Sequence, residues 1–468
     1  MLNRITGSTL GNGGGVINPL IFREYDIRGR VGEDLTPETV VSIGRGFGTY
    51  AARNGVRSLM LGRDCRLSSS SFRDALVEGL LSSGVNVIDV GICPTPLLYF
   101  SIIQFGADGG VMVTGSHNPP EFNGFKLSVG PSTLYGEKIQ EIRRIIEKGD
   151  FAAGEGKESR REVLPEYREY VLKNISIPRR LKVVVDAGNG TGGPVAPALF
   201  REMGLTVVEL FCEMDGRFPN HFPDPTVPEN LHSLIQAVRE TGADVGVAYD
   251  GDADRIGAVN EKGEILYGDY LLALFARDIL RRKPGATIIS EVKASQNLYD
   301  DIARHGGKAI MWKVGHSLIK KKMKEESAEV AGEMSGHIFF ADRYLGFDDA
   351  IYASARLFEI LAHSNRTLSE MLSDLPPVVA TPEIRVTCPD EHKFRVVERV
   401  AEIVRPQARE VIDVDGVRAL FDGGWGLVRA SNTQPVLVLR FEGKDQETVE
   451  RIRAVMENAV GTAKSGIA

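Results

Sequence analysis

An apolar run passes directly into three alternating aspartates in the segment Val245-Gly246-Val247-Ala248-Tyr249-Asp250-Gly251-Asp252-Ala253-Asp254-Arg255. The apolar part predicts a buried β-strand. Three carboxylates at every second position converge on one cation only where the backbone bends into a tight loop, and the intervening Gly and Ala leave room for that bend. Hard oxygen ligands select Mg²⁺ or Ca²⁺ over softer metals. Because a Mg²⁺ ion held by few carboxylates keeps positions for phosphate oxygens, the segment indicates phosphate chemistry at the end of a strand.

Two other interpretations of the aspartate segment, an EF-hand and a solvated acidic turn, fit its neighbours less well. An EF-hand loop also begins D-x-D-x-D, and Glu261 falls at its twelfth position. However, that loop requires Gly at its sixth position, where Arg255 stands, and its flanks are helices. Residues 244–248 and 255–259 predict strands instead. Acidic turns are common, but three alternating aspartates closed by an arginine after a buried strand are not.

The same order of elements recurs three times in the first three quarters of the chain. Each copy has a buried strand, a helical stretch, a second strand and then a third strand. The first strands are predicted at residues 59–62, 183–186 and 287–290, the second at 85–90, 205–211 and 309–314, and the third at 110–113, 245–248 and 329–331. Strands that alternate with helices indicate largely parallel sheets with helices on both faces, so the predicted fold class is α/β.

Each third strand is followed by a polar motif. Residues 114–120 are Thr-Gly-Ser-His-Asn-Pro-Pro, the aspartate segment follows in the second copy, and residues 332–337 are Gly-Glu-Met-Ser-Gly-His. Ligand sites in open α/β sheets lie beyond the carboxyl ends of the strands. Three motifs in equivalent places therefore predict three topologically similar mixed α/β domains that face one central cleft.

The last quarter of the chain has a different pattern. A strand at residues 383–387 and a helix at 391–403 are followed by strands near 410–413, 427–430 and 436–441 and by a helix at 445–460. Strands without crossover helices predict a C-terminal α+β domain on an antiparallel sheet. With a charged connector at residues 149–162, these patterns predict a tail and four domains, at residues 1–18, 19–161, 162–267, 268–377 and 378–468.

Composition narrows the partners and the compartment. A net charge of −7 gives no electrostatic reason to expect nucleic acid or an anionic membrane as a partner, and no apolar stretch is long enough to span a bilayer. The Gly-rich residues 1–18 lack the apolar core of a signal peptide and predict a mobile tail. The four cysteines are widely scattered, which suits a reducing compartment, so we expect the cytoplasm.

The motif around Ser116 offers a hydroxyl for phosphate chemistry. His117 is adjacent and Lys126 lies ten positions on. A serine hydroxyl is a poor nucleophile unless a base, a cation or a metal activates it, so Ser116 is predicted to be either a nucleophile or a stable phosphate carrier. Gly, Ser, Asn and Pro also favour ordinary turns. The whole pattern T-G-S-H-N-P-P-x-x-N-G-F-K beside an aspartate triplet favours chemistry.

Four segments together resemble the signature loops of the α-D-phosphohexomutase superfamily, namely residues 114–126, 250–255, 332–337 and 429–433. The resemblance covers nearly the whole chain in the right order, beginning with residues 22–29. Within the superfamily, residues 312–323 and 347–349 are most similar to the bacterial phosphomannomutase/phosphoglucomutase group. Phosphoglucosamine mutases typically carry Gln where Met334 stands. The resemblance therefore implies a mutase that acts on hexose phosphates.

The resemblance implies a reaction that agrees with the predicted metal site. Ser116 would carry a phosphoryl group, and one oxygen of that group would hold Mg²⁺ together with Asp250, Asp252 and Asp254. The phosphoserine would phosphorylate a hexose 1-phosphate or 6-phosphate of mannose or glucose. The product, a hexose 1,6-bisphosphate such as glucose 1,6-bisphosphate, would serve as intermediate and activator, and its other phosphate would return to Ser116. Phosphate would thus move reversibly between C1 and C6.

The same resemblance implies roles for further residues. Lys126 and His117 are candidates for proton transfer, and Lys126 would need a depressed pKa to act as a base, which burial near Mg²⁺ and Arg could provide. Charge near the phosphoryl group would be stabilised by Arg28 and Arg255. The sugar would contact Glu333, Ser335, His337, His316, Lys293 and Tyr25. The non-reacting phosphate would be anchored on the last domain by Arg429, Ser431, Asn432 and Thr433. Closure of that domain would exclude water.

Two other function classes share part of this pattern. A metal-dependent sugar-phosphate phosphatase would use the same phosphoserine, but hydrolysis needs water beside the phosphoryl group, whereas the cluster at Arg429 fits a closing anchor domain. A non-catalytic sugar-phosphate sensor would be expected to lose Ser116 or an aspartate, and none is lost. The predicted partners are small hexose phosphates, and the chain is expected to be a monomer or a weak homo-oligomer.

Overall fold

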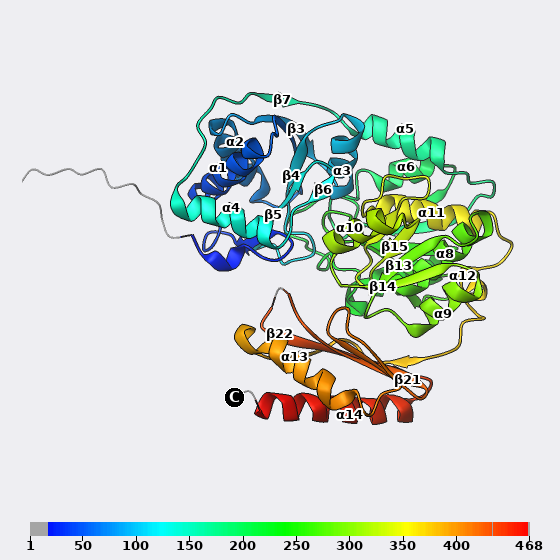
Figure 1. Ribbon diagram of the computed structural model, residues 1–468. Helices are drawn as coiled ribbons and strands as arrows, with labels where there is room; N and C mark the ends of the chain where they lie inside the picture. Colours follow the sequence, from blue (N-terminus) through cyan, green and yellow to red (C-terminus); the bar gives the residue numbers. More distant parts are fainter. Residues whose placement is uncertain (1–16, 433, 467–468) are drawn as a thin grey trace, which may run out of the picture.

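The computed structural model describes residues 17–432 and 434–466 (Figure 1). Residues 1–16 of the predicted tail and Thr433 of the predicted phosphate cluster lie outside the described residues. The described chain forms four β-sheets, which follow one another along the sequence with their own helices. Within the described part of the chain, no helix is both long enough and apolar enough to cross a membrane.

The first sheet is mixed and has the strand order β1-β5-β4-β2-β3-β7, with β6 paired to β5. β2 is parallel to β3 and β4, and β7 is parallel to β3, whereas β5 is antiparallel to both β4 and β1. Alternate residues of β2 enter two different cores, so α1, α2 and α4 cover one face and α3 covers the other. The chain order is η1 (Pro19–Ile21), β1 (Ile27–Arg30), α1 (Pro37–Arg53), β2 (Ser58–Arg63), α2 (Ser69–Ser82), β3 (Asn86–Ile92), α3 (Thr95–Gln104), β4 (Gly109–Val113), β5 (Phe122–Val129), β6 (Ser132–Thr133), α4 (Glu137–Lys148) and β7 (Glu158–Arg160).

The second sheet has the order β12-β11-β10-β8-β9. β8 is parallel to β9 and β10, and β11 is antiparallel to β10 and β12. The predicted strand before the aspartates is β10, and all of its residues are buried. The chain order is α5 (Leu164–Asn174), β8 (Lys182–Asp186), α6 (Ala196–Glu202), β9 (Thr206–Leu210), η2 (Pro228–Leu231), α7 (His232–Thr241), β10 (Val245–Tyr249), β11 (Ile256–Asn260) and β12 (Ile265–Leu266).

The third sheet has the order β14-β13-β15-β16. β13 is parallel to β14 and β15, and β16 runs antiparallel to β15. The helix α11, which follows this sheet, is buried along its whole length. The chain order is α8 (Gly268–Arg282), β13 (Thr287–Glu291), α9 (Gln296–Arg304), β14 (Lys308–Trp312), α10 (His316–Glu326), β15 (Val330–Gly332), β16 (Ile338–Phe340), α11 (Ala350–Ala362) and α12 (Leu368–Met371).

The fourth sheet is antiparallel throughout and has the order β17-β22-β21-β20-β19, with β18 also paired to β22. The helices α13 and α14 lie together on one face of this sheet (Figure 1). This domain has a hydrophobic core of its own, separate from the core shared by the first three domains. The chain order is β17 (Val379–Ala380), β18 (Ile384–Thr387), α13 (Asp390–Val404), β19 (Glu410–Ile412), β20 (Val417–Phe421), β21 (Gly424–Ala430), β22 (Val436–Gly443) and α14 (Gln446–Ser465).

The predicted mixed α/β architecture with an antiparallel C-terminal sheet is confirmed, with one addition that the sequence patterns did not predict. Each polar motif joins the third strand of its copy to a following antiparallel strand, in the pairs β4–β5, β10–β11 and β15–β16. The predicted connector at residues 149–162 also differs, because it contributes the edge strand β7 to the first sheet. The three motif loops therefore occupy equivalent hairpin positions in the three sheets.

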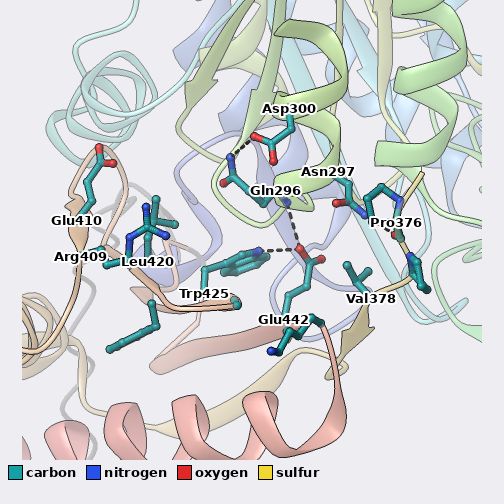
Figure 2. A pocket seen from close by; sticks show the side chains of 16 residues that line it. Gln296, Asn297, Asp300, Pro376, Val378, Arg409, Glu410, Leu420, Trp425 and Glu442 are labelled. Carbon is teal, nitrogen blue, oxygen red and sulfur yellow. Dashed lines mark hydrogen bonds between the residues drawn. The ribbon is translucent and has the colours of Figure 1, made fainter. Parts of the chain in front are cut away.

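The C-terminal domain meets the third domain at a polar junction beside a pocket of about 480 Å³. The pocket lies between the start of α9, the linker at residues 376–378 and the strands β20 to β22 (Figure 2). The buried Glu442 carboxylate accepts hydrogen bonds from Trp425 Nε1 (2.8 Å), Ser295 Oγ (2.9 Å) and the Gln296 amide (3.1 Å). None of the residues that line this pocket belongs to the polar motifs.

Candidate active site

The polar motifs of the first three domains meet one another in the folded chain. From the first domain, Lys126 Nζ donates to Asp252 Oδ2 in the second domain (2.7 Å) and also bonds Asp254 Oδ2. An antiparallel backbone bridge joins Arg255 of the second domain to His337 of the third. The structure therefore brings together groups that lie more than two hundred residues apart in the sequence, such as Lys126 and His337.

The serine loop holds its hydroxyl against the aspartate loop. Ser116 is buried, and its φ of 50° lies in the left-handed region, which is uncommon for a residue with a side chain. Its amide donates to Thr114 Oγ1 (2.8 Å). Its hydroxyl donates to Asp250 Oδ2 (2.8 Å) and lies 3.2 Å from His117 Nδ1. The backbone of the loop thus fixes the hydroxyl beside a carboxylate.

The side chain of Arg66 holds the backbone of the serine loop through hydrogen bonds. This guanidinium is fully buried and pairs with Asp64 (3.1 Å). It also donates to four backbone carbonyls, those of Ser116 (2.8 Å), Asn118 (2.5 Å), Pro119 (2.6 Å) and Phe122 (3.0 Å). Sequence reasoning missed Arg66, although it follows the carboxyl end of the buried strand β2, where ligand-site residues are expected.

The three aspartates form a buried cluster that fits a divalent cation. Asp250, Asp252 and Asp254 are fully buried, and one oxygen from each lies within 4.8 Å of the others. Among the described residues, Oδ1 of Asp252 has no hydrogen-bond partner, and Oδ1 of Asp254 has only a longer contact of 3.4 Å with His337 Nε2. Burial and the two neighbouring carboxylates raise the pKa of Asp250 well above its ordinary value. Unpaired carboxylate oxygens in a buried site are unfavourable unless a cation binds them, so this all-oxygen set suits Mg²⁺.

The electrostatic environment of Lys126 differs from the one expected. Lys126 lies on β5, where it is paired in register with Met112 of β4. Burial disfavours its ammonium form, but the contacts with Asp252 and Asp254 outweigh burial and hold its pKa well above the ordinary value. The expected depression of this pKa depended on a neighbouring Mg²⁺ and stays a prediction, because the carboxylates that would hold the cation bind the lysine here.

Further charged groups surround the serine. Burial, together with the charges of Arg255 and Arg28, lowers the pKa of His117 well below its ordinary value, so its imidazole is neutral at neutral pH. Arg255 Nε lies 4.0 Å from Asp250 Oδ2 and 3.3 Å from His337 Nε2. Arg28 Nη2 pairs with Asp26 Oδ2 (2.5 Å). These two arginines bring positive charge close to the serine and aspartate loops.

The loop of residues 332–337 presents a carboxylate that is already held from two sides. Glu333 is buried, and its Oε1 accepts from the Gly315 amide (2.7 Å). Its Oε2 lies 2.9 Å from His337 Nδ1, and Ser335 Oγ lies 3.2 Å from the same nitrogen. Burial opposes the charged form of His337, but Asp254 and Glu333 outweigh burial and raise its pKa to about 9. His337 therefore links the aspartate cluster to Glu333.

The two weaker sugar-contact candidates of the third domain occupy different surroundings. Lys293 Nζ pairs with Glu383 Oε1 of the C-terminal domain (2.7 Å) and lies 3.9 Å from Glu291. His316 begins α10 and packs edge-to-face against Tyr25, with ring centroids 6.1 Å apart. Its ring also lies beside that of His337, with centroids 5.5 Å apart. His316 thus lies next to two other predicted site residues, whereas Lys293 contacts two glutamates that were not predicted.

Tyr25 and the predicted phosphate-binding loop at residues 429–433 lie where the first, third and C-terminal domains meet. The Tyr25 hydroxyl donates to the carbonyl of Val314 in the third domain (2.9 Å) and accepts from Asn432 Nδ2 in the C-terminal domain (2.9 Å). Arg429 Nε donates to Asp415 Oδ2 (3.0 Å), and the same oxygen accepts from the Val314 amide (3.0 Å). Ser431 is buried in the same loop. Arg429 and Asn432 therefore lie at the contacts between three domains.

Two further residues of this region were missed by sequence reasoning. Thr95 begins α3 and donates from Oγ1 to Asp252 Oδ2 (2.5 Å), so it holds one of the aspartates. Asp415 holds Arg429, as described above, and lies in a turn before β20. No local pattern distinguishes these residues from ordinary turn and cap residues, because their partners are distant in sequence.

Comparison with known proteins agrees with this geometry. The four domain models of phosphoglucomutase/phosphomannomutase match consecutive parts of the chain: α/β/α domain I at residues 19–153, domain II at 165–263, domain III at 267–379 and the C-terminal domain at 383–459. The chain belongs to the phosphoglucomutase/phosphomannomutase family. This finding confirms the resemblance that was recognised from the four signature loops, and with it the prediction of a phosphohexomutase.

Several members of the phosphoglucomutase/phosphomannomutase family are similar over almost the whole chain. Phosphomannomutase/phosphoglucomutase of Pseudomonas aeruginosa is 48% identical over 447 residues, which cover 96% of each chain. Phosphoglucomutase of Neisseria gonorrhoeae is 47% identical over 446 residues and covers 94% of this chain and 97% of its own. The crystal structure of a family protein from Burkholderia thailandensis superposes with a TM-score of 0.90 at 42% identity, covering 97% of this chain and 99% of that one.

Proposed function

We propose that this chain reversibly moves phosphate between C1 and C6 of mannose and glucose phosphates, through a phosphoserine at Ser116 and a hexose 1,6-bisphosphate. The observation that carries this proposal is the buried Ser116 hydroxyl, which lies 2.8 Å from Asp250 Oδ2 of the buried aspartate cluster that could hold a cation. The names of the similar proteins from Pseudomonas aeruginosa and Neisseria gonorrhoeae support the choice of mannose and glucose phosphates.

In this proposal phosphorylated Ser116 transfers its phosphoryl group to the free hydroxyl of a hexose monophosphate. The bond between Ser116 Oγ and phosphorus breaks, a bond from the sugar oxygen to phosphorus forms, and the sugar hydroxyl loses its proton. The resulting bisphosphate turns end for end and returns its other phosphoryl group to Ser116 Oγ. Mg²⁺, bound by Asp250, Asp252 and Asp254, would withdraw charge from the phosphoryl oxygens.

The chain's own side chains supply the remaining tasks. We assign proton transfer at the sugar hydroxyl to His117 or Lys126, and stabilisation of phosphoryl charge to Arg28 and Arg255. His117, as a neutral imidazole 3.2 Å from the Ser116 hydroxyl, is in a protonation state that can accept a proton. Lys126 keeps its proton while it pairs with Asp252 and Asp254, so it can give up that proton only when these carboxylates bind another cation.

The remaining residues bind the substrate at its two ends. The sugar contacts are assigned to Glu333, Ser335, His337, His316, Lys293 and Tyr25, and the non-reacting phosphate to Arg429, Ser431, Asn432 and Thr433. An anchor on a separate domain favours a mutase over a phosphatase, because an anchored bisphosphate can be retained while water is excluded. This is the reason to prefer the mutase over hydrolysis.

One assay separates the three function classes. The protein is incubated with glucose 1-phosphate, Mg²⁺ and a trace of glucose 1,6-bisphosphate. Formation of glucose 6-phosphate without free phosphate supports the mutase, free phosphate supports the phosphatase, and no change supports the sensor. The same assay on mannose 1-phosphate measures the preference between the two sugars.

The first prediction concerns the phosphate carrier. Ser116→Ala should lower turnover by at least about 10³-fold, because the acceptor of the phosphoryl group is removed. Intact-mass measurement of active protein should find one added phosphate, and peptide mapping should place it at Ser116. Ser132→Ala, at an exposed serine of the same domain, serves as the control and should leave turnover unchanged. Full turnover by Ser116→Ala, with no phosphate at this residue, would refute the mechanism.

The proposal extends to the cellular location of the enzyme and to its small-molecule partners. We propose a cytoplasmic location, which is supported by the four free cysteines Cys65, Cys93, Cys212 and Cys388. Hexose phosphates are the proposed partners, with hexose 1,6-bisphosphate as activator. The expectation of a monomer or a weak homo-oligomer stays a prediction.

A further inference from the structure

A buried carboxylate behind the sugar-contact histidines has a distinctive set of neighbours. Asp348 is fully buried and directly precedes the N-cap residue of α11. Its Oδ1 accepts a hydrogen bond from Lys320 Nζ (3.0 Å), and that ammonium lies 4.3 Å from the centroid of the Tyr99 ring. One oxygen of Asp348 is thus paired with a cation, so the buried charge is compensated.

The second oxygen of Asp348 faces two imidazole rings. Oδ2 lies 3.6 Å from His316 Nδ1 and 4.0 Å from His337 Nε2. Among the described residues, neither Asp348 Oδ2 nor His316 Nδ1 has a hydrogen-bond partner, and both atoms are buried. These two unpaired atoms are therefore separated by a gap slightly longer than a hydrogen bond.

Such a pair of buried orphan atoms is unfavourable unless the gap closes. A buried polar group that lacks a hydrogen-bond partner loses its hydration without compensation. Hydrogen bonds of catalytic groups are often long in unliganded proteins and shorten in the substrate complex. When His316 Nδ1–H donates to Asp348 Oδ2, the tautomer of His316 is fixed and Nε2 is left as the acceptor on the opposite edge of the ring.

We propose that Asp348 is a positioning residue, which orients His316 and its neighbour His337 toward the sugar through Oδ2. Asp348 itself touches neither the sugar nor the phosphoryl group. It acts by fixing which nitrogen of His316 carries the proton and where the ring points. The inference deepens the proposed function, because it rests on the assignment of His316 and His337 to the sugar site.

The adjacent residue provides a matched control. Asp349 is also buried, but its Oδ2 accepts from the hydroxyls of Tyr167 (2.9 Å) and Tyr344 (2.6 Å), and its Oδ1 caps α11 by accepting from the Tyr352 amide (2.9 Å). These partners are structural and none is assigned to the active site. Asp348→Asn and Asp349→Asn remove a carboxylate charge from neighbouring buried positions, but only Asp348→Asn is expected to impair catalysis.

The first arm of the test is kinetic. Asp348→Asn should lower kcat on the order of 10²-fold with KM within about threefold of the wild type, because the lost orientation matters most in the transition state. Asp349→Asn should leave kcat within about threefold, whatever its effect on the melting temperature. In a double-mutant cycle, Asp348→Asn should add little to the loss caused by His316→Ala, since both remove the same unit. Unchanged kcat in Asp348→Asn, or losses that multiply fully with His316→Ala, would overturn the inference.

The second arm does not depend on activity. Long-range ¹H–¹⁵N spectra of the imidazoles, assigned through His316→Ala, should show His316 as the Nδ1–H tautomer in the wild type. In Asp348→Asn the Nε2–H form should gain population, whereas Asp349→Asn should retain the wild-type spectrum. If the wild type makes no glucose 6-phosphate but this tautomer shift is seen, the proposed function fails and the positioning role stands. If the tautomer is the same in all three proteins, the positioning role fails.

Discussion

Two residues with side chains adopt left-handed backbone conformations where the serine and aspartate loops meet. Ser116 has a φ of 50° and Ala253 a φ of 55°. Between them, a Cβ atom at Gly251 would lie 2.6 Å from the Ser116 carbonyl oxygen, closer than real Cβ contacts. Residues held in sparsely populated conformations cluster at functional sites, because the surrounding structure must stabilise them. The contact of these loops explains why glycine, the smallest residue, separates the first two aspartates.

Glu333 is the residue at which substrate recognition is most directly testable. Glu333→Ala should raise KM for both glucose 1-phosphate and mannose 1-phosphate by about 10- to 100-fold, since hydrogen bonds to a charged group contribute about 1.5–3 kcal/mol. We assign the Glu333 carboxylate to the sugar hydroxyls O3 and O4. Because glucose and mannose differ at C2, the rise should be similar for the two sugars. Steady-state kinetics with both substrates measure the effect.

The control for Glu333 is an exposed carboxylate of the same domain. Glu325→Ala, on the outer face of α10, should leave KM unchanged for both sugars. An unchanged KM in Glu333→Ala would remove Glu333 from the sugar site. A rise for one sugar alone would show that the residue contacts the C2 end instead.

At the scale of elements, the sequence predicted the first strand and the loop of each motif hairpin, but not the antiparallel pairing with the strand that follows the loop. The buried strands β2, β8 and β13 and the loops after β4, β10 and β15 were predicted, because apolar runs followed by polar motifs are local patterns. The placement of Lys126 on β5 was not, since β5 contains polar residues and its pairing with β4 depends on contacts across the sheet. The same limit applies to its pKa, which is set by Asp252 and Asp254 of another domain. Local sequence thus indicated the proposed site residues but not their electrostatic partners.

A buried ion-pair cluster joins the elements of the third domain. Asp342, in the loop after β16, accepts from Arg282 of α8 (2.8 Å) and Arg356 of α11 (2.9 Å) and lies 3.1 Å from Lys283. Burial alone would raise the pKa of Asp342, but these cations outweigh burial and lower it. Arg356 is itself fully buried, so it depends on this carboxylate for compensation.

Asp342→Asn should therefore destabilise the protein by about 3 kcal/mol at pH 7, because it leaves Arg356 buried with less compensation. Since the folded pKa of Asp342 is depressed, its contribution is present above its unfolded pKa of about 4 and is lost as pH falls through the folded value. Urea unfolding at pH 7, 4 and 3 should show a gap between wild type and variant that shrinks only below about pH 4. Asp422→Asn, at a carboxylate that is 91% exposed, should show no gap. A gap independent of pH would mean that shape, and not charge, is responsible.

At the scale of the whole molecule, the C-terminal domain is the part joined least extensively to the rest. Its core is separate, and it meets the third domain through a small apolar cluster of Val292, Trp425 and Leu427 together with polar contacts. It carries the proposed phosphate anchor, so its position relative to the third domain determines whether a bisphosphate can be held at both ends. A separate core with few apolar contacts is the arrangement expected of a domain that moves.

Arg418 fastens this junction. Its fully buried guanidinium donates to the carbonyls of Val292 (2.6 Å) and Ala294 (2.7 Å) and lies over the Trp425 ring, 3.8 Å from the centroid. Burial lowers the pKa of Arg418 to about 10, so the group is still charged at neutral pH. The two carbonyls flank Lys293, so the residue that holds the domain also holds the loop of a proposed sugar contact.

Arg418→Met should leave two buried carbonyls unpaired and weaken the junction by about 3 kcal/mol. The hydrophobic cores of the two domains should be unaffected. Scanning calorimetry should then resolve the C-terminal domain as a separate transition at lower temperature, whereas Arg453→Met on the exposed face of α14 should unfold like the wild type. Because the anchor would sample positions too far from the serine, KM for glucose 1-phosphate should rise in the variant. A single unshifted transition with an unchanged KM would show that the anchor domain is positioned by the contacts of Tyr25 and Asn432 and not by this arginine.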